Sequence, residues 1–207
     1  MTGDASSATA PDQLVSGPAP GAPGIAPTWS SSAKDAVGTS QYASRVWFTV
    51  GHGILNEIYW PRVDAPQVRD LGFIVADGSG FWSEVKRDAE VEVGFVRPGI
   101  PAVVAVHRHS RYVLVLRICA DDHADVVRIE ATLEDLRSSS DQARTLHPLR
   151  LYPLLAPHLG FNGLHNRAWI GTYKGHPTLF AQNDPASPAL CSDSPPLQPR
   201  AGYVGAS

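Results

Sequence analysis

Residues 44–78 read SRVWFTVGHGILNEIYWPRVDAPQVRDLGFIVADG, and this stretch decides the fold class. It contains three apolar runs rich in the β-branched and aromatic side chains that suit a pleated sheet, at residues 46–50, 54–60 and 71–76. Glycines on both sides of His52 can turn the chain, and Pro61 and Pro66 cannot donate hydrogen bonds to a sheet. The stretch therefore predicts a meander of strands with polar loops at its ends.

Further strands are expected along the rest of the chain. Alternating or β-branched segments predict them at residues 81–86, 90–96, 102–109, 112–119, 126–133, 149–155, 168–173 and 178–182. Gly78 and Gly80 indicate a hairpin turn, and Pro153 indicates an edge strand or a bulge. Residues 136–145 and 158–166 are predicted to be surface loops. The β-branched content and short spacing of the segments at 102–109, 112–119 and 126–133 favour consecutive antiparallel pairing of these three.

The composition agrees with an all-β protein. A chain of 207 residues can form one large domain, and 18 glycines and 18 prolines favour turns over long helices. The formal charge of −3 and the absence of a basic cluster with interleaved aromatics argue against nucleic acid as a partner. No apolar run approaches the roughly 20 residues that cross a bilayer, so no membrane partner is expected.

The N-terminal residues 1–24 are rich in Ala, Gly, Pro and Ser, and we expect them to form a disordered tail before a domain over residues 25–207. They lack the basic start and apolar segment of a signal peptide, so a cytoplasmic location is expected. Cys119 and Cys191 fit no metal-ligand spacing, and the sequence leaves open whether they form a disulfide.

Several ordered segments resemble the N-terminal domain of bacterial glucoamylases and glucodextranases. Besides residues 46–78, they are GIAPTW (24–29), SAKDAVGT (32–39), GFWSEVKR (80–87), LLAPHLG (154–160), NRAW (166–169) and AGYVGAS (201–207). The resemblance implies a large antiparallel β-sandwich of the galactose-mutarotase-like type, which in the family precedes a catalytic barrel of paired α-helices. It also implies that residues 138–146 are an insertion and that the sandwich is incomplete at its C-terminal end, without the barrel.

No catalytic residue can be assigned. Glycoside hydrolysis needs an acid and a base or nucleophile, and the candidate carboxylates are Glu57, Asp64, Asp70, Asp77 and Glu84. None matches the family's catalytic glutamates, which belong to the barrel. Nucleophile elbows, phosphate-binding glycine loops and zinc-protease helices are also absent from the sequence, so no cofactor is expected.

The strongest polar candidate site comprises Tyr59, Trp60, Arg62 and Asp64. Aromatic faces stack on sugar rings, and an Arg–Asp pair can make directed hydrogen bonds to hydroxyl groups. These residues are therefore predicted to lie at the rim of a substrate site or at a domain interface. A strand end with a structural ion pair is the alternative.

Histidines and one tryptophan offer weaker candidates. His107 and His109 lie two apart on a predicted strand and could supply two imidazoles to zinc, but no third ligand follows at a recognisable spacing. We expect exposed strand residues and assign no metal site. His52 is expected to be hydrogen-bonded to backbone, and Trp29 is interpreted as a packing residue or as a sugar platform.

Two functions remain open. The first is a non-catalytic N-terminal module of a glucoamylase- or glucodextranase-like, exo-acting α-glucan hydrolase, as the resemblance implies. Its expected partners are the catalytic helical barrel of the same enzyme and an α-glucan, and the chain alone is expected to be inactive. The alternative is a stand-alone carbohydrate-binding or structural β-sandwich. An exposed apolar patch would favour the first function.

Overall fold

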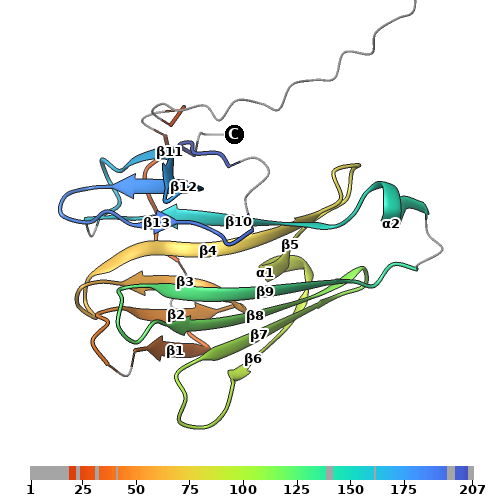
Figure 1. The fold of residues 1–207 in the computed structure, drawn as a ribbon, viewed down its shortest axis with the longest axis horizontal. Helices are drawn as coiled ribbons and strands as arrows, with labels where there is room; N and C mark the ends of the chain where they lie inside the picture. Colours follow the sequence, from red (N-terminus) through yellow and green to blue (C-terminus); the bar gives the residue numbers. More distant parts are fainter. Residues whose placement is uncertain are drawn as a thin grey trace, which may run out of the picture. The chain divides into compact units, whose positions relative to one another are not determined.

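The computed structural model describes residues 19–21, 24–30, 33–40, 42–138, 142–160, 162–194 and 199–204. The chain divides into two compact units, Ala26–Leu164 and the combination of Met1–Ile25 with His165–Ser207. Three antiparallel sheets account for the named strands, and the two helices are short (Figure 1). The all-β, antiparallel class expected from the sequence is confirmed.

The larger unit contains a first sheet, called sheet A, in the order β1-β2-β3-β4-β10, with β5 also paired to β4. Its strands are β1 (Ala36–Thr39), β2 (Trp47–Gly51), β3 (Ile54–Tyr59), β4 (Pro66–Ala76), β5 (Trp82–Glu84) and β10 (Arg150–Pro157). β4 begins five residues before the predicted run, because Pro66 stands at the first position of the strand, opposite Tyr59, where proline is tolerated. β10 is an edge strand, as Pro153 predicted.

The second sheet of this unit, sheet B, has the order β6-β7-β8-β9. Its strands are β6 (Glu90–Phe95), β7 (Val103–His109), β8 (Tyr112–Ala120) and β9 (Val127–Asp135). Alternate residues of β8 are fully buried, namely Tyr112, Leu114, Leu116 and Ile118. This period of two shows that one face of sheet B is covered and the other is not.

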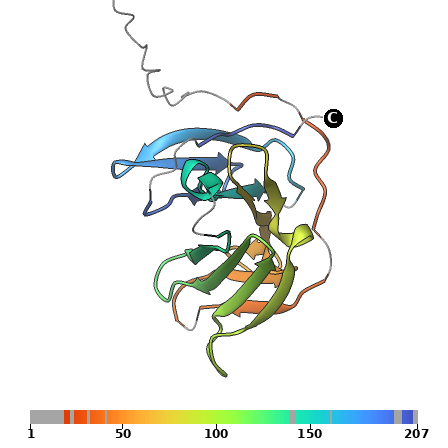
Figure 2. The same cartoon turned by 90° about the vertical axis from the view of Figure 1, so that its right-hand side faces the viewer.

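Sheets A and B pack face to face in Figures 1 and 2, where the green strands lie against the orange ones. Phe48, Val50 and Val75 of sheet A are fully buried, like the inner residues of β8. A buried hydrogen bond of 2.7 Å joins Ser83 Oγ of β5 to the Tyr112 hydroxyl of β8. The larger unit is therefore a β-sandwich with one apolar core.

Three short elements of the larger unit differ from the predictions. β1 was not predicted; its Gly38 lies under the Phe48 ring, where an added Cβ would be 2.1 Å from Phe48 Cζ. Residues 85 and 86, predicted as strand, begin the helix α1 (Val85–Asp88), where Asp88 Oδ2 accepts the Glu84 N–H at 2.8 Å. The one-turn helix α2 (Gln142–Leu146) begins within the predicted loop at 136–145.

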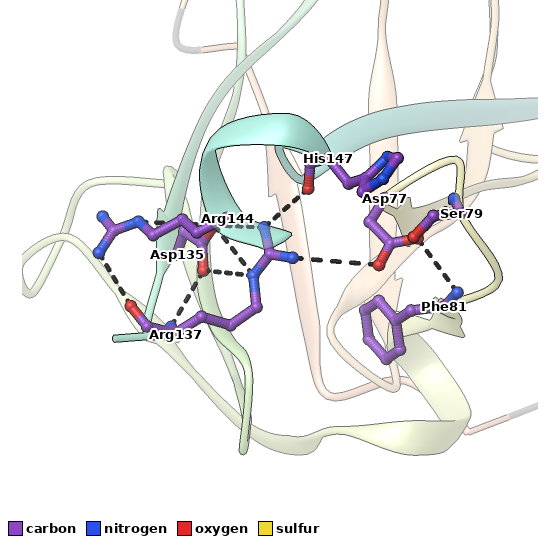
Figure 3. A network of polar contacts seen from close by, with 7 residues as sticks. All are labelled: Asp77, Ser79, Phe81, Asp135, Arg137, Arg144 and His147. Atoms are coloured by element: carbon purple, nitrogen blue, oxygen red, sulfur yellow. Dashed lines mark hydrogen bonds and ion pairs between the residues drawn. The ribbon is translucent and has the colours of Figure 1, made fainter. Parts of the chain in front are cut away.

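A polar network holds the end of β9 near the β4–β5 turn and the start of β10 (Figure 3). The Arg137 side chain is 8% exposed and donates to Asp135 Oδ2 at 2.7 Å and to the His147 carbonyl at 2.9 Å. Arg137 also lies 3.9 Å from Asp77 Oδ2, while Arg144 donates to the Arg137 carbonyl at 2.8 Å. The network fixes both ends of the segment that contains α2.

The smaller unit contains sheet C, in the order β11-β12-β13. Its strands are β11 (Arg167–Tyr173), β12 (His176–Gln182) and β13 (Ala189–Leu190). Lys174 and Gly175 turn the chain with positive φ angles, so His176 and Pro177, predicted as part of the turn, belong to β12. Of the predicted tail, residues 1–18, 22 and 23 lie outside the described part, whereas Pro20 accepts a hydrogen bond from Tyr203 N–H at 2.8 Å.

Candidate functional site

The predicted site residues lie at one end of the larger unit, on the connection between β3 and β4. Tyr59 ends β3, and the Trp60–Pro61 peptide bond is cis. The loop is closed by backbone hydrogen bonds from Trp60 N–H to the Ala65 carbonyl and from Ala65 N–H to the Arg62 carbonyl, both at 3.0 Å. The structure thus presents Trp60, Arg62 and Asp64 on one tight loop.

Trp60 belongs to a cluster built from three separate segments. Its indole N–H donates to Asp125 Oδ2 at 2.6 Å, and Arg45 Nη2 donates to the same oxygen at 2.7 Å. The Arg45 guanidinium carbon is 5.4 Å from the centre of the Trp60 ring, a cation–π arrangement. The backbone N–H of Arg45, the Trp60 indole and the Arg45 guanidinium lower the pKa of Asp125. We call Arg45, Trp60 and Asp125 the end cluster.

Arg62 and Asp64 form an ion pair beside the end cluster. Arg62 Nε donates to Asp64 Oδ1 at 2.9 Å and Nη2 donates to Oδ2 at 2.5 Å, with side chains that are 74% and 60% exposed. The hydrogen bonds from Arg62 lower the pKa of Asp64. Both side chains point away from the core, so they are accessible to a partner. An exposed pair of this kind contributes little to stability.

Tyr59 lies in a different environment from the loop that follows it. Its hydroxyl donates to Glu57, which also accepts Lys34 Nζ at 3.0 Å and Ser30 Oγ at 3.1 Å. Burial, with the hydrogen bond and charge of Glu57, raises the pKa of Tyr59 to about 12. Burial alone would raise the pKa of Glu57, but the hydrogen bonds from Tyr59, Lys34 and Ser30 outweigh it, and the net shift is downward.

The carboxylates considered for catalysis are engaged in structural contacts. Glu57 and Asp64 have the partners described above, and Asp77 Oδ1 accepts the backbone N–H groups of Ser79 and Phe81 at 2.8 and 3.1 Å. The Ser79 N–H is the main cause that lowers the pKa of Asp77. A general acid requires the opposite shift, because it must hold its proton near neutral pH. These three carboxylates are therefore poorly suited to that role.

The histidine pair does not form an exposed site. His107 is fully buried, with Nε2 2.9 Å from the Gly53 carbonyl, so the expectation of exposure was wrong for this residue. His109 stacks on Tyr112 at 4.8 Å between ring centres. Among the described residues, no group of three or more His, Cys, Asp or Glu side chains could hold a metal.

Other residues that the sequence raised have the following environments. His52 has a φ of 54°, and its backbone N–H donates to Asp35 Oδ2 at 2.8 Å. Trp29 is 40% exposed and contacts the His158 ring edge to face at 5.0 Å. Cys119 and Cys191 are free thiols. Within the described part of the chain, no helix has the length and apolar character needed to span a bilayer.

Sequence reasoning missed two members of the end cluster. Arg45 lies before β2 and Asp125 lies in the β8–β9 turn, separated by 80 residues. The pairing of β2 with β3 inside sheet A brings Arg45 to Trp60, and the packing of sheet B on sheet A brings Asp125 to both of them. In the sequence, only Asp125 has a feature that could have indicated such a site, because it belongs to the polar turn between two predicted strands.

Comparison with known proteins identifies the family. A sequence model described as "Glucodextranase, domain N" matches residues 19–207.

The chain belongs to the glucodextranase domain N family.

Two relatives of this domain N are glucoamylases. The "Glucoamylase" of Clostridium sp. (strain G0005) is 30% identical over 174 residues, which are 83% of this chain and 24% of that protein. A bacterial glucoamylase whose crystal structure is complexed with acarbose matches with a TM-score of 0.78 and 27% identity, covering 86% of this chain and 26% of that chain. This domain N therefore spans about a quarter of the length of these relatives.

Proposed function

We propose that this domain N is a non-catalytic β-sandwich module of an exo-acting α-glucan hydrolase of the glucoamylase or glucodextranase type, and that it supports a catalytic barrel of paired α-helices. The proposal is carried by the share of each relative's length to which this chain corresponds. The family match extends over residues 19–207, whereas the part of the chain that aligns with each glucoamylase corresponds to about a quarter of that relative. The remaining three quarters of such a relative can hold the chemistry.

The electrostatics of the module support a non-catalytic role. Glu57, Asp64 and Asp77 each have a lowered pKa because they accept hydrogen bonds. A carboxyl group stabilised in this way is already ionised at neutral pH, so it holds no proton to donate as a general acid. Moreover, Glu57 accepts from Tyr59, Lys34 and Ser30, so little of its acceptor capacity is left for a substrate.

Two activity measurements test this proposal. The purified chain is expected to release no glucose from starch, maltooligosaccharides or dextran. A chimera in which the chain replaces the corresponding segment of the Clostridium glucoamylase should release glucose and melt at a higher temperature than the same enzyme lacking that segment. Glucose release by the chain alone, lost on substitution of a single Asp or Glu, would contradict the non-catalytic role.

We further propose that the loop carrying Trp60, Arg62 and Asp64 faces the barrel and positions its active-site loops. The exposure of the Arg62–Asp64 pair and its place beside the end cluster support this role. In the chimera, Arg62→Ala should lower kcat/KM by about 10- to 100-fold, the scale typical of lost outer-sphere support. Arg117→Ala is the matched control, because Arg117 is 53% exposed and pairs with Glu130 on sheet B. Equal kinetics for both variants and the unsubstituted chimera would refute this role.

A further inference from the structure

The outer face of sheet A carries exposed aromatic side chains that the proposed module function does not use. Trp82 is 67% exposed and Tyr152 is 41% exposed. Tryptophan is usually among the more buried residues, so a Trp exposed to this degree on a regular strand is informative. Phe95, on sheet B, is also exposed at 53% and provides a comparison.

The strand register places Trp82 and Tyr152 on the same face. Ala76 of β4 pairs with Trp82 of β5 on one side and with Arg150 of β10 on the other, which makes one row of residues across the three strands. Two residues earlier on β4, Ile74 pairs with Glu84 of β5 and Tyr152 of β10, which makes a second row. Residues two apart on a strand share a face, so these two rows are adjacent on one surface. The intervening Val75 and Ser83 are buried on the opposite, inner face. With strands about 4.8 Å apart, β5 and β10 flank β4 at a mutual separation of about 10 Å.

Ion pairs confirm which polar groups share this surface. Lys86 Nζ lies 3.2 Å from Glu84 Oε1 and 3.9 Å from Asp70 Oδ2. Asp70 is opposite Ala156 of β10, four residues along β4 from Ile74 and therefore on the same face. Charged donors and acceptors thus begin in the row of Tyr152 itself and continue along the sheet.

We propose that this surface binds an α-glucan chain, with Trp82 and Tyr152 stacking on glucose rings. A pyranose ring presents C–H groups that pack on an aromatic face, and its hydroxyls need nearby polar partners. The exposed Arg150 provides donors, and Glu84, whose oxygens also meet Lys86 and Arg87, retains acceptor capacity. A docked protein domain is the less favoured occupant, because interface cores are depleted of charged residues, whereas this surface carries charges in both of its rows. The choice of α-glucan rests on the proposed function, whereas the aromatic and polar geometry does not.

Native gel electrophoresis of the chain alone, with and without soluble starch in the gel, tests the proposal. Starch is expected to retard the chain, and Trp82→Ala and Tyr152→Ala are each expected to weaken the apparent affinity by roughly tenfold, the scale for loss of an aromatic anchor. Phe95→Ala is the matched control and should be retarded like the unsubstituted chain. Equal melting temperatures of the variants and the unsubstituted chain verify that each is folded.

Either of two results would overturn the glucan surface. One is equal mobility of the unsubstituted chain with and without starch, and the other is equal weakening by Phe95→Ala and Trp82→Ala. The assay measures binding and needs no barrel, so its failure is distinguishable from failure of the hydrolysis test. Loss of glucose release by the chimera with retained starch binding would reject only the module function.

Discussion

The buried hydrogen bond between Ser83 and Tyr112 offers a direct test of how the sandwich is assembled. Ser83 is in sheet A and Tyr112 is in sheet B, their oxygens are 2.7 Å apart, and the residues are 1% and 0% exposed. Tyr112→Phe removes the tyrosine hydroxyl and leaves the Ser83 hydroxyl buried without this hydrogen-bond partner. Such a loss costs about 1–3 kcal/mol of unfolding free energy, because the remaining group is dehydrated in the folded state.

The double variant gives the sharper measurement. Ser83→Ala should cost a similar amount to Tyr112→Phe, since it leaves the tyrosine hydroxyl buried. The double variant leaves neither group behind, so it should cost about as much as one single variant, with a coupling energy of about 1 kcal/mol or more. Urea unfolding followed by circular dichroism measures all four proteins. Tyr152→Phe, at an exposed tyrosine, is the control and should change stability by less than about 0.5 kcal/mol.

Additive costs for Ser83→Ala and Tyr112→Phe would refute this reasoning. Zero coupling would mean that the two hydroxyls do not share a hydrogen bond across the sandwich. The packing of β5 against β8 would then need to be revised.

Three other predictions concern stability. Gly53→Ala should lower the melting temperature more than Gly78→Ala. Both glycines have a positive φ, but of the two only Gly53 lies where an added Cβ would clash, at 2.5 Å from Val91 Cγ1. Equal losses of melting temperature would exclude the clash. Burial lowers the pKa of His107 and His158 below the ordinary 6.5, so below that pH the unfolded chain binds protons that the folded chain does not. The free energy of unfolding in urea should therefore fall as the pH drops below 6.5, by at most about 1.4 kcal/mol per pH unit for each histidine, until the folded pKa values are passed. A constant urea midpoint between pH 7.5 and 5.5 would contradict this. Arg137→Met should lower the urea midpoint, because it removes the cation that Asp77 and Asp135 share and leaves Asp135 with Arg144 alone, at 3.8 Å. An unchanged midpoint would show that the network does not stabilise the fold.

Most strands were predictable because their signal is local. Alternation or β-branched content is visible within one segment, as in 112–119, and the structure has β8 there with alternate residues buried. The hairpin across Gly78 and Gly80 was predictable for the same reason, and β4 pairs with β5 as expected. β1 was missed because its residues are too few and too small for a periodic signal, and its position depends on packing of Gly38 against Phe48.

The candidate site was only partly predictable. The prolines and aromatics of residues 59–66 indicated a loop at a strand end, and that loop is present with the Arg62–Asp64 pair. Its interaction with Asp125 was not visible in the sequence, because Asp125 lies 65 residues from Trp60 and 80 residues from Arg45. Arg45 is much nearer to Trp60 in the sequence, but their contact depends on the register of β2 and β3. The roles of Tyr59, Trp60, Arg62 and Asp64 toward a barrel or a glucan remain predictions.

The sequence by itself therefore determined the all-β class, the positions of most strands along the chain and the family, since each follows from local residue patterns or from extended similarity along the chain. Only the tertiary structure decided which side chains share a surface. The burial of His107, the end cluster and the row of Trp82, Ala76 and Arg150 all depend on strand register and on the packing of one sheet against another. Register and packing are set by non-local contacts, and these have no signature in any single segment.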